Sequence, residues 1–143
     1  MKFVVVLLAA VASVSAACTF SQREAEDILK LYGVRASSSG NCTTKTNPRC
    51  TSYEGIQCST VWNLAGLASD TGSCPIVVTG GTEAGHAHGP YSHENGYAVN
   101  LRKEQCLKKF IQDNFKKSGG CWKDSLGNQY CERTNRWDVT YYK

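Results

Sequence analysis

Three histidines, His86, His88 and His93, lie in one short stretch of this 143-residue chain, HAHGPYSHENGYAVN, and the chain has no other histidine. Asn100, seven residues after His93, ends the stretch. A catalytic zinc site needs about three protein ligands, usually histidine and carboxylate, and an open position for water. Bound zinc lowers the pKa of that water and polarises a carbonyl group. The residue types of this stretch therefore point to a metal site.

Strands on either side of the stretch are expected to position its side chains. The segment 74–81, CPIVVTGG, is β-branched and ends in two glycines, as expected of a short buried strand. The segment 82–95 has no apolar periodicity and is predicted to be a long loop. In the strand predicted over 96–101, alternation places Ala98 and Asn100 on one face, where the small alanine leaves space beside the amide.

A final strand is predicted near the C-terminus, in the sequence RWDVTYYK. Alternation places its apolar residues on one side and its polar residues, Arg136 and Asp138 among them, on the other. If this strand is the neighbour of the segment 96–101 in a sheet, Arg136 and Asp138 converge with the histidine-rich stretch.

Helices are predicted from apolar spacing and from capping residues. Ser21 and Glu24 form a capping box at the start of the first helix, and Ser52 can cap the second. The predicted helices span residues 21–33, 52–72 and 102–117. A hairpin that turns at 126–128 follows the third helix. This order of elements indicates an α+β domain, in which a small antiparallel sheet packs with about three helices.

The eight cysteines predict a disulfide framework, because small secreted domains use cysteine in this way. They allow roughly a hundred pairings, and the sequence alone does not choose among them. Local spacing favours one pair across a turn-rich loop and one across the hairpin, which leaves four cysteines for two further pairs. The four pairs are then Cys42–Cys50, Cys121–Cys131, Cys74–Cys106 and Cys18–Cys58.

The first 17 residues are predicted to be a secretory signal peptide. Lys2 precedes an apolar run over 3–14, and small residues follow it up to Ala17. The run is shorter than the ~20 residues of a membrane span. Residues 18–143 then form a single secreted domain of about 126 residues, a size that suits one core.

The charge of the mature chain argues against nucleic acid as a partner. Without Lys2 the chain has 15 basic and 12 acidic residues. This mild excess is not the clustered basic surface of a nucleic-acid-binding protein. We therefore expect an extracellular monomer that binds neither nucleic acid nor a membrane.

The segments YSHENGYAVNL and RWDVTYY together resemble the signature of the Hedgehog/D-alanyl-D-alanine peptidase superfamily. This superfamily includes lysostaphin-type and penicillin-insensitive murein peptidases. Its signature is a histidine, six residues, an aspartate and a later His-x-His on a strand near the C-terminus. The resemblance covers most of the mature chain, from about Cys42 onward, and is strongest to small secreted members common in fungi. It implies the peptidase fold, a zinc cofactor and a peptide or cell-wall (peptidoglycan) fragment as substrate.

The chain departs from this signature at several positions. His93 matches the first zinc ligand, whereas Asn100 lies where the acidic ligand belongs. Asp138 lies where the final histidine ligand belongs, and Arg136 where a histidine assists catalysis. An amide is a far poorer zinc donor than a carboxylate, and arginine stays protonated and cannot act as a base. Arg136 can instead pair with Asp138 and replace the charge of the lost ion.

The two other histidines offer an alternative. His86 and His88, with Glu83 and Asp138, could rebuild a metal site from other ligands, because imidazole suits zinc. Glu83 is also a candidate proton shuttle by its position. The plainer interpretation, which we prefer, is that the two loop histidines line a groove.

The sequence thus supports two hypotheses. The first is a secreted zinc peptidase that hydrolyses cell-wall peptides at a remodelled or impaired metal site. The second is a non-catalytic secreted binding or effector protein on a peptidase fold. The candidate metal ligands are His93, Asp138, Asn100 and His86, and the candidate catalytic residues are Glu83 and Arg136.

Overall fold

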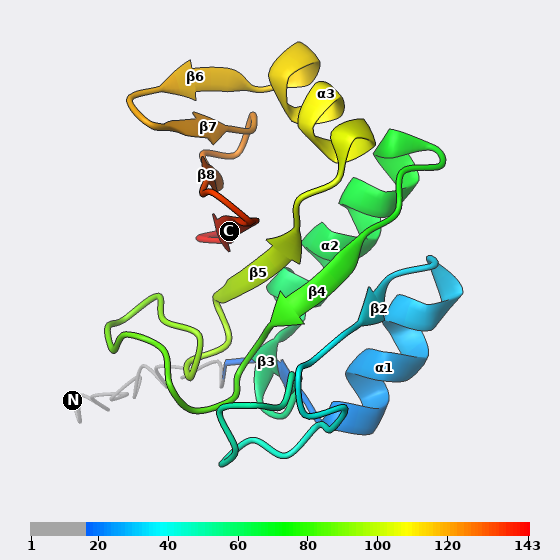
Figure 1. Cartoon of the computed structure of the whole chain (residues 1–143), viewed down its shortest axis with the longest axis vertical. Helices are drawn as coiled ribbons and strands as arrows, with labels where there is room; N and C mark the ends of the chain where they lie inside the picture. The colour runs from blue at the N-terminus through cyan, green and yellow to red at the C-terminus, as the bar shows by residue number, and fades with distance from the viewer. Residues whose placement is uncertain (1–16) are drawn as a thin grey trace, which may run out of the picture.

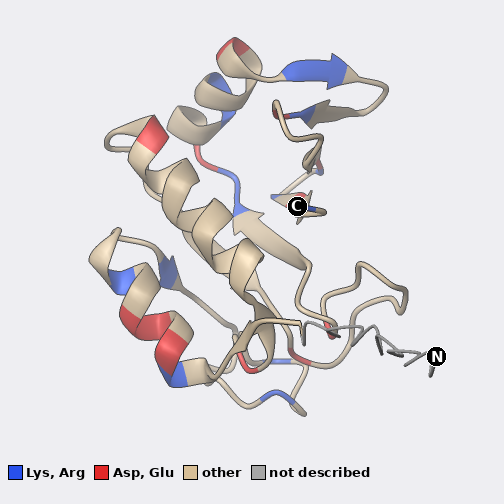
Figure 2. Cartoon of the chain, turned by 180° about the vertical axis from the view of Figure 1, so that it is seen from behind, with Lys and Arg blue, Asp and Glu red and all other residues tan. Residues whose placement is uncertain are grey.

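The computed structural model describes residues 17–143, so all but the last residue of the predicted signal peptide lies outside the described part. Within residues 17–143 the fold is α+β, as expected, with three helices, a seven-stranded sheet and a separate two-stranded sheet. The helices are α1 (Gln22–Leu31), α2 (Cys58–Thr71) and α3 (Gln105–Asn114). Figure 1 shows α2 behind β4 and β5, and the reverse view in Figure 2 shows α1 and α2 side by side.

The large sheet places the two strands of the sequence signature at its centre. In spatial order its strands are β2 (Arg35–Ala36), β4 (Val77–Gly80), β5 (Ala98–Arg102), β9 (Arg136–Thr140), β8 (Gln129–Glu132), β7 (Cys121–Lys123) and β6 (Lys116–Ser118). The two-stranded sheet pairs β1 (Thr19–Phe20) with β3 (Ile56–Gln57). The last strand is the neighbour of the segment 96–101, so the condition for convergence is met, because β9 pairs with β5 along its whole length.

The large sheet is mixed, and the expectation of a purely antiparallel sheet is wrong in this respect. β2 runs parallel to β4, whereas the other neighbours are antiparallel. After α1 the chain turns at Gly33 and joins the edge of the sheet, where the amide of Ser37 donates to the carbonyl of Val78 at 2.9 Å. A two-residue strand is too short to show apolar alternation, so the sequence carried no signal for it.

The helix boundaries agree with the sequence where a local cap defines them. Ser21 caps α1, its hydroxyl accepting from the amide of Glu24 at 3.3 Å while the Glu24 carboxylate accepts from the Ser21 amide at 3.2 Å. The predicted start of the second helix at Ser52 is wrong, because α2 begins at Cys58. Ser52 is fully buried, and its amide donates to the side chain of Glu83. Ser52 therefore bonds a residue that is distant in the sequence and does not cap α2.

The third helix is shorter than predicted at both ends. α3 ends at Asn114, and residues 116–118, which were expected to continue the helix, form β6 against β7. The hairpin that pairs β7 with β8 is as predicted, and Gly127 has a positive φ of 85° in its turn.

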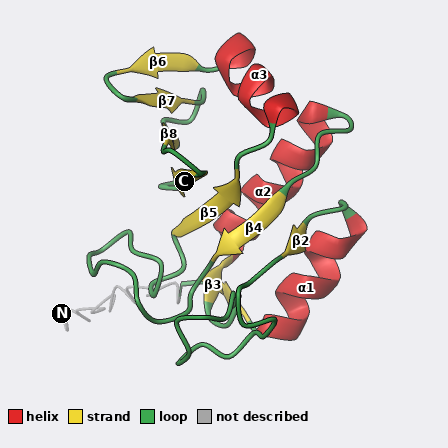
Figure 3. Ribbon diagram, in the orientation of Figure 1, coloured by secondary structure: helices red, strands yellow, loops and turns green. Residues whose placement is uncertain are grey.

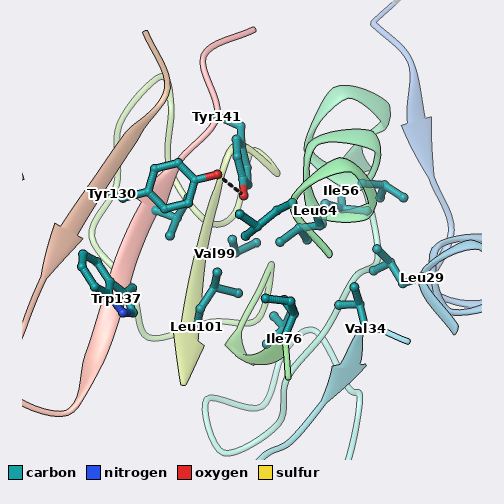
Figure 4. Packing of buried hydrophobic residues seen from close by; sticks show 14 of the residues in the cluster. Leu29, Val34, Ile56, Leu64, Ile76, Val99, Leu101, Tyr130, Trp137 and Tyr141 are labelled. Atoms are coloured by element: carbon teal, nitrogen blue, oxygen red, sulfur yellow. Dashed lines mark hydrogen bonds between the residues drawn. The ribbon is translucent and has the colours of Figure 1, made fainter. Parts of the chain in front are cut away.

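One hydrophobic core lies between the helices and the sheet (Figure 4). β9 contributes Trp137 and Val139 to it, Tyr141 follows directly after β9, and β5 contributes Val99 and Leu101. These residues alternate with the polar residues of the same strands, so the predicted division of β9 into an inner and an outer side is confirmed. The outer side of both strands is thereby left for a functional site.

Four disulfides join the described elements, and all four predicted pairings are confirmed. Cys18–Cys58 ties the start of the described part of the chain to the first residue of α2, and Cys74–Cys106 ties the segment before β4 to α3. This framework is consistent with a secreted protein, because disulfides persist in oxidising compartments. Among the described residues, no helix has the length and apolarity needed to cross a bilayer.

Two buried tyrosines differ in how their hydroxyl groups are satisfied. Tyr141 bonds the hydroxyl of Tyr130 at 2.9 Å, whereas the Tyr53 hydroxyl has no hydrogen-bond partner among the described residues. We expect Tyr53→Phe to leave the free energy of unfolding unchanged or raise it by up to about 1 kcal/mol, because an unpaired buried hydroxyl is removed. Tyr141→Phe should lower it by about 1–3 kcal/mol, because the Tyr130 hydroxyl loses its partner.

Urea unfolding of the two variants and of the parent protein measures this difference. Each variant is the control for the other, since both lose one buried hydroxyl. Equal destabilisation by both substitutions would contradict the assignment of the two hydroxyl groups.

Candidate metal centre

A cleft of about 490 Å³ opens on the outer side of β5 and β9. Its floor consists of cross-strand pairs, in which Asn100 faces Asp138 and Ala98 faces Thr140. The expectation that Ala98 and Asn100 share a face is therefore confirmed. The long loop between β4 and β5 is drawn in green in Figure 3, and it supplies one wall of the cleft, with His86 and His93 in the lining. The four family-pattern positions, including Arg136, line this one cleft.

Glu83 lies behind this wall and is only 2% exposed. Its Oε1 accepts from the amides of Gly81 at 2.7 Å and Ser52 at 3.0 Å, and its Oε2 bonds Nε2 of His86. Burial opposes ionisation of Glu83, but the hydrogen bonds from His86, Ser52 and Gly81 outweigh it, and the pKa of the carboxyl group is lowered. Glu83 is therefore an anion at neutral pH.

Glycine at position 81 makes this arrangement fit. A Cβ atom on Gly81 would lie 2.0 Å from the carbonyl oxygen of Ser52. The close approach also lets the amide of Thr82 donate to that carbonyl at 2.7 Å. The end of β4 is thus fastened to the segment that precedes α2, and Glu83 is held in a defined position.

His86 and His93 stack on each other beside Glu83. Their ring centroids are 3.7 Å apart, and the ring planes differ by 10°. Nδ1 of His93 lies 2.8 Å from the carbonyl oxygen of Gly81. Because a carbonyl only accepts, Nδ1 carries the proton and Nε2 has the free lone pair, as in many metal-binding histidines.

The environment of His93 favours its neutral form. Burial and the neighbouring His86 lower the pKa of His93, and together they outweigh the raising effects of the Gly81 carbonyl, Glu83 and Asp138. Neutral imidazole is the form that binds a metal ion.

Glu83, His86 and His93 form a group that could hold a metal ion. One potential ligand atom from each lies within 4.8 Å of the other two. Ligands bound to zinc at ~2.0–2.1 Å lie about 3.4 Å apart in a tetrahedral site, so modest side-chain rotations would bring the three atoms together. Two histidines and a glutamate are also the protein ligands of one type of catalytic zinc site. The donor set therefore fits zinc.

The ligand set of the family pattern fits an ion less well. Both oxygens of Asp138 accept hydrogen bonds, Oδ1 from Nε of Arg136 at 2.7 Å and Oδ2 from Nε of Arg133 at 2.8 Å. Burial opposes ionisation of Asp138, but the two guanidinium groups outweigh it and lower the pKa of the carboxyl. The expected pairing of Arg136 with Asp138 is present, and two cations already neutralise the carboxylate.

Asn100 contributes no charge to the cleft floor. It is 8% exposed, and its side chain has no hydrogen-bond partner among the described residues. It lies over Gly80, where a Cβ atom would be 2.6 Å from the amide nitrogen of Asn100. An uncharged amide at this position would not neutralise an ion held between His93 and Asp138.

His88 lies apart from the metal group. It is on the exposed side of the loop, and its Nδ1 lies 2.7 Å from Oε1 of Glu94. From the sequence, Glu83 and His86 were grouped with His88 and Asp138 as an alternative site, and His93 was assigned to the family pattern, so the group Glu83, His86 and His93 was not predicted as such. The sequence analysis did not identify Arg133 as a site residue. Arg133 lies in the tight turn before β9, where its amide donates to the carbonyl of Arg136 at 2.8 Å, and this position was the only indication of its role.

Comparisons of the chain with protein-family models, with curated proteins and with solved structures found no match. The chemistry of the site is therefore argued from its geometry.

The histidines should titrate in a characteristic order in the metal-free protein. We expect His93 to titrate below the ordinary value of 6.5, because it is buried next to His86. His88 should titrate above 6.5, because the Glu94 carboxylate stabilises its protonated form. The lowered folded-state pKa of His93 means that the unfolded chain binds more protons, so this contribution to stability is lost as the pH falls below 6.5.

Histidine side-chain NMR signals followed against pH measure both values. Glu94→Gln is the control, and it should return His88 to an ordinary pKa without moving His93. The same midpoint for His88 and His93 would contradict the described environments.

Proposed function

We propose that this protein is a secreted zinc-dependent peptidase-like hydrolase, with a remodelled metal site made of Glu83, His86 and His93. The observation that carries the proposal is the convergence of these three side chains at the wall of a cleft. The resemblance of the segment around His93 to zinc peptidases that cleave cell-wall peptides supports the reaction type. The disulfide framework supports an extracellular site of action.

Each residue of the group would have a distinct part in the site. His93 would bind the ion through Nε2, since the Gly81 carbonyl holds its Nδ1 proton. Glu83 would supply the negative charge, with Oε1 held by two backbone amides. Bound zinc would lower the pKa of a water molecule and polarise the amide carbonyl of a peptide.

Arg136 would contribute its positive charge and would not transfer protons. Arginine remains protonated at any physiological pH, so it cannot take the part of a catalytic base. It lines the cleft that contains His93, and its guanidinium group could pair with an anionic group of the ligand. Asp138 would orient the arginine and would not ligate the ion, since two guanidinium cations already neutralise its carboxylate.

The metal content of purified, fully oxidised protein tests this proposal. After incubation with zinc and dialysis, we expect about one zinc ion per chain, measured by elemental mass spectrometry. His93→Ala should lose most of the metal, because it removes a ligand. His88→Ala, a matched histidine variant outside the group, should retain it.

In the same experiment, Asp138→Asn distinguishes the Glu83–His86–His93 group from the family-pattern ligands, which include Asp138. Retention of zinc by Asp138→Asn supports the Glu83–His86–His93 group, whereas its loss would assign the ion to the family-pattern residues. Absence of zinc from the parent protein would overturn the proposal.

A second candidate function is a non-catalytic binding protein, and the Asp138 cluster favours it. Arg136 and Asp138 lie where the family pattern has its two late histidines, and the guanidinium groups of Arg133 and Arg136 both bind Asp138. Asn100 lies where the pattern has its acidic ligand. A positive charge fixed in the protein would then replace the ion, and the cleft would serve recognition alone.

Restoring the family pattern tests this second candidate. If the parent protein binds no zinc, the double variant Asn100→Asp/Arg136→His should gain zinc affinity of at least about tenfold, because a carboxylate and an imidazole are returned beside His93. Calorimetric titration with zinc measures the gain. Arg136→His alone, which leaves the amide of Asn100 in place, is the control. No gain of zinc affinity in the double variant would contradict the interpretation that the cleft is a former zinc site that lost its ligands.

A further inference from the structure

The permanently charged residues of the cleft lining are two arginines and one aspartate. Arg133 and Arg136 against Asp138 leave a net charge of +1. A third arginine, Arg102, stands directly opposite Arg136 in the β5–β9 pairing and makes no ion pair among the described residues. Like charges directly opposite each other destabilise a sheet. Stability alone does not account for this cross-strand pair of arginines, of which Arg136 lines the cleft.

The hydrogen bonds of the two arginines leave most of their donors free. Each arginine bonds Asp138 through Nε, and within the described residues their terminal Nη groups make no hydrogen bond. The side chains of Arg133 and Arg136 are 53% and 46% exposed, so these groups are accessible to a ligand. Asp138 uses one oxygen on each arginine and thereby fixes the orientation of both.

The chemistry of this cluster selects the kind of ligand. A guanidinium group presents parallel N–H donors that match the two oxygens of a carboxylate. One carboxylate would balance the net charge of +1 that the cluster leaves. A neutral peptide segment would leave that charge unpaired in a half-enclosed cleft.

The dimensions of the cleft indicate a short extended peptide. From Arg136 to Thr140, β9 rises about 13 Å at ~3.3 Å per residue, which is the length of about four extended residues. At the far end the cleft is lined by Tyr91 and Tyr142, whose ring centroids are 4.8 Å apart. Both rings are partly exposed, at 47% and 39%, and can cover apolar parts of a ligand.

Building on the proposed function, we infer that Arg133 and Arg136 form a subsite for a carboxylate of the peptide ligand. The cleft is thereby selective for peptides that carry a free carboxylate at this end. The carboxylate comes either from the C-terminus of the peptide or from an acidic side chain, since both present the same two oxygens. Arg133 and Arg136 are binding residues in this assignment, and Asp138 is a positioning residue.

The test compares three short peptides on the oxidised protein, with zinc and with EDTA in parallel. The probes are N-acetyl-trialanine, the same peptide as its C-terminal amide, and N-acetyl-Ala-Glu-Ala amide. Calorimetry measures affinity, and the NMR signals of the arginine Nε–H groups report on the subsite itself. Inorganic phosphate is titrated at the same ionic strength.

We expect at least one carboxylate-bearing peptide to bind about tenfold or more tightly than the trialanine amide, because a charge-assisted bidentate hydrogen bond is lost with the carboxylate. A preference for the trialanine acid identifies the C-terminus as the source, and a preference for the glutamate peptide identifies the side chain. Binding should shift the Nε–H signals of Arg133 and Arg136. Arg133→Gln and Arg136→Gln should each reduce the preference, whereas Arg23→Gln, an exposed arginine variant on α1, should retain it.

Three results would overturn the subsite. These are equal affinity of acid and amide peptides, a preference that survives in both cleft variants, and tighter binding of phosphate than of either carboxylate peptide. The subsite would also be overturned if the Nε–H NMR signals of Arg133 and Arg136 did not shift at about 10 mM peptide. The EDTA arm separates this outcome from the metal proposal, because the arginine subsite contains no metal ligand and zinc binding is measured independently.

Discussion

A buried carboxylate needs compensating hydrogen bonds, and Glu83 obtains them from three residues. Ser52 lies 31 residues away in the sequence, whereas Gly81 directly follows β4 and His86 lies three residues after Glu83 in the long loop. These bonds fasten the start of that loop to the segment before α2. His93 then stacks on His86 and bonds the carbonyl of Gly81, so the metal group depends on the position of one anion.

The pairing of β5 with β9 is the second constraint, because it separates core from site. Trp137, Val139 and Tyr141 fill the core, while the residues between them form the floor of the cleft. One alternation thus provides both stability and a rigid platform. The disulfides add to this rigidity, because Cys74–Cys106 ties the segment before β4 to α3 and Cys121–Cys131 ties β7 to β8, the neighbour of β9.

The charged residues in and behind the cleft wall form two groups, one suited to bind a cation and the other suited to bind an anion. Glu83 with two histidines is a donor set for a cation, whereas Arg133 and Arg136 present donors for an anion. Asp138 lies between these groups but is neutralised by the arginines. With the proposed cation site on its wall and the proposed carboxylate subsite at its end, the cleft would hold a short acidic peptide across a polarising centre, and without the ion it would still bind such a peptide.

Features that depend on neighbours in the sequence could be predicted from the sequence alone. The capping box of α1, the alternation of β9 and the local disulfides involve residues within a few positions of each other, or within one hairpin. The histidine-rich loop and its candidate residues were also evident. Only the tertiary structure decided that Ser52 binds Glu83 and does not cap a helix, that β2 joins the sheet in parallel, and that Arg133 shares Asp138 with Arg136. It also brought Glu83, His86 and His93 into one group, since the partners of a buried charge are chosen by proximity in the folded chain, which residue spacing does not encode.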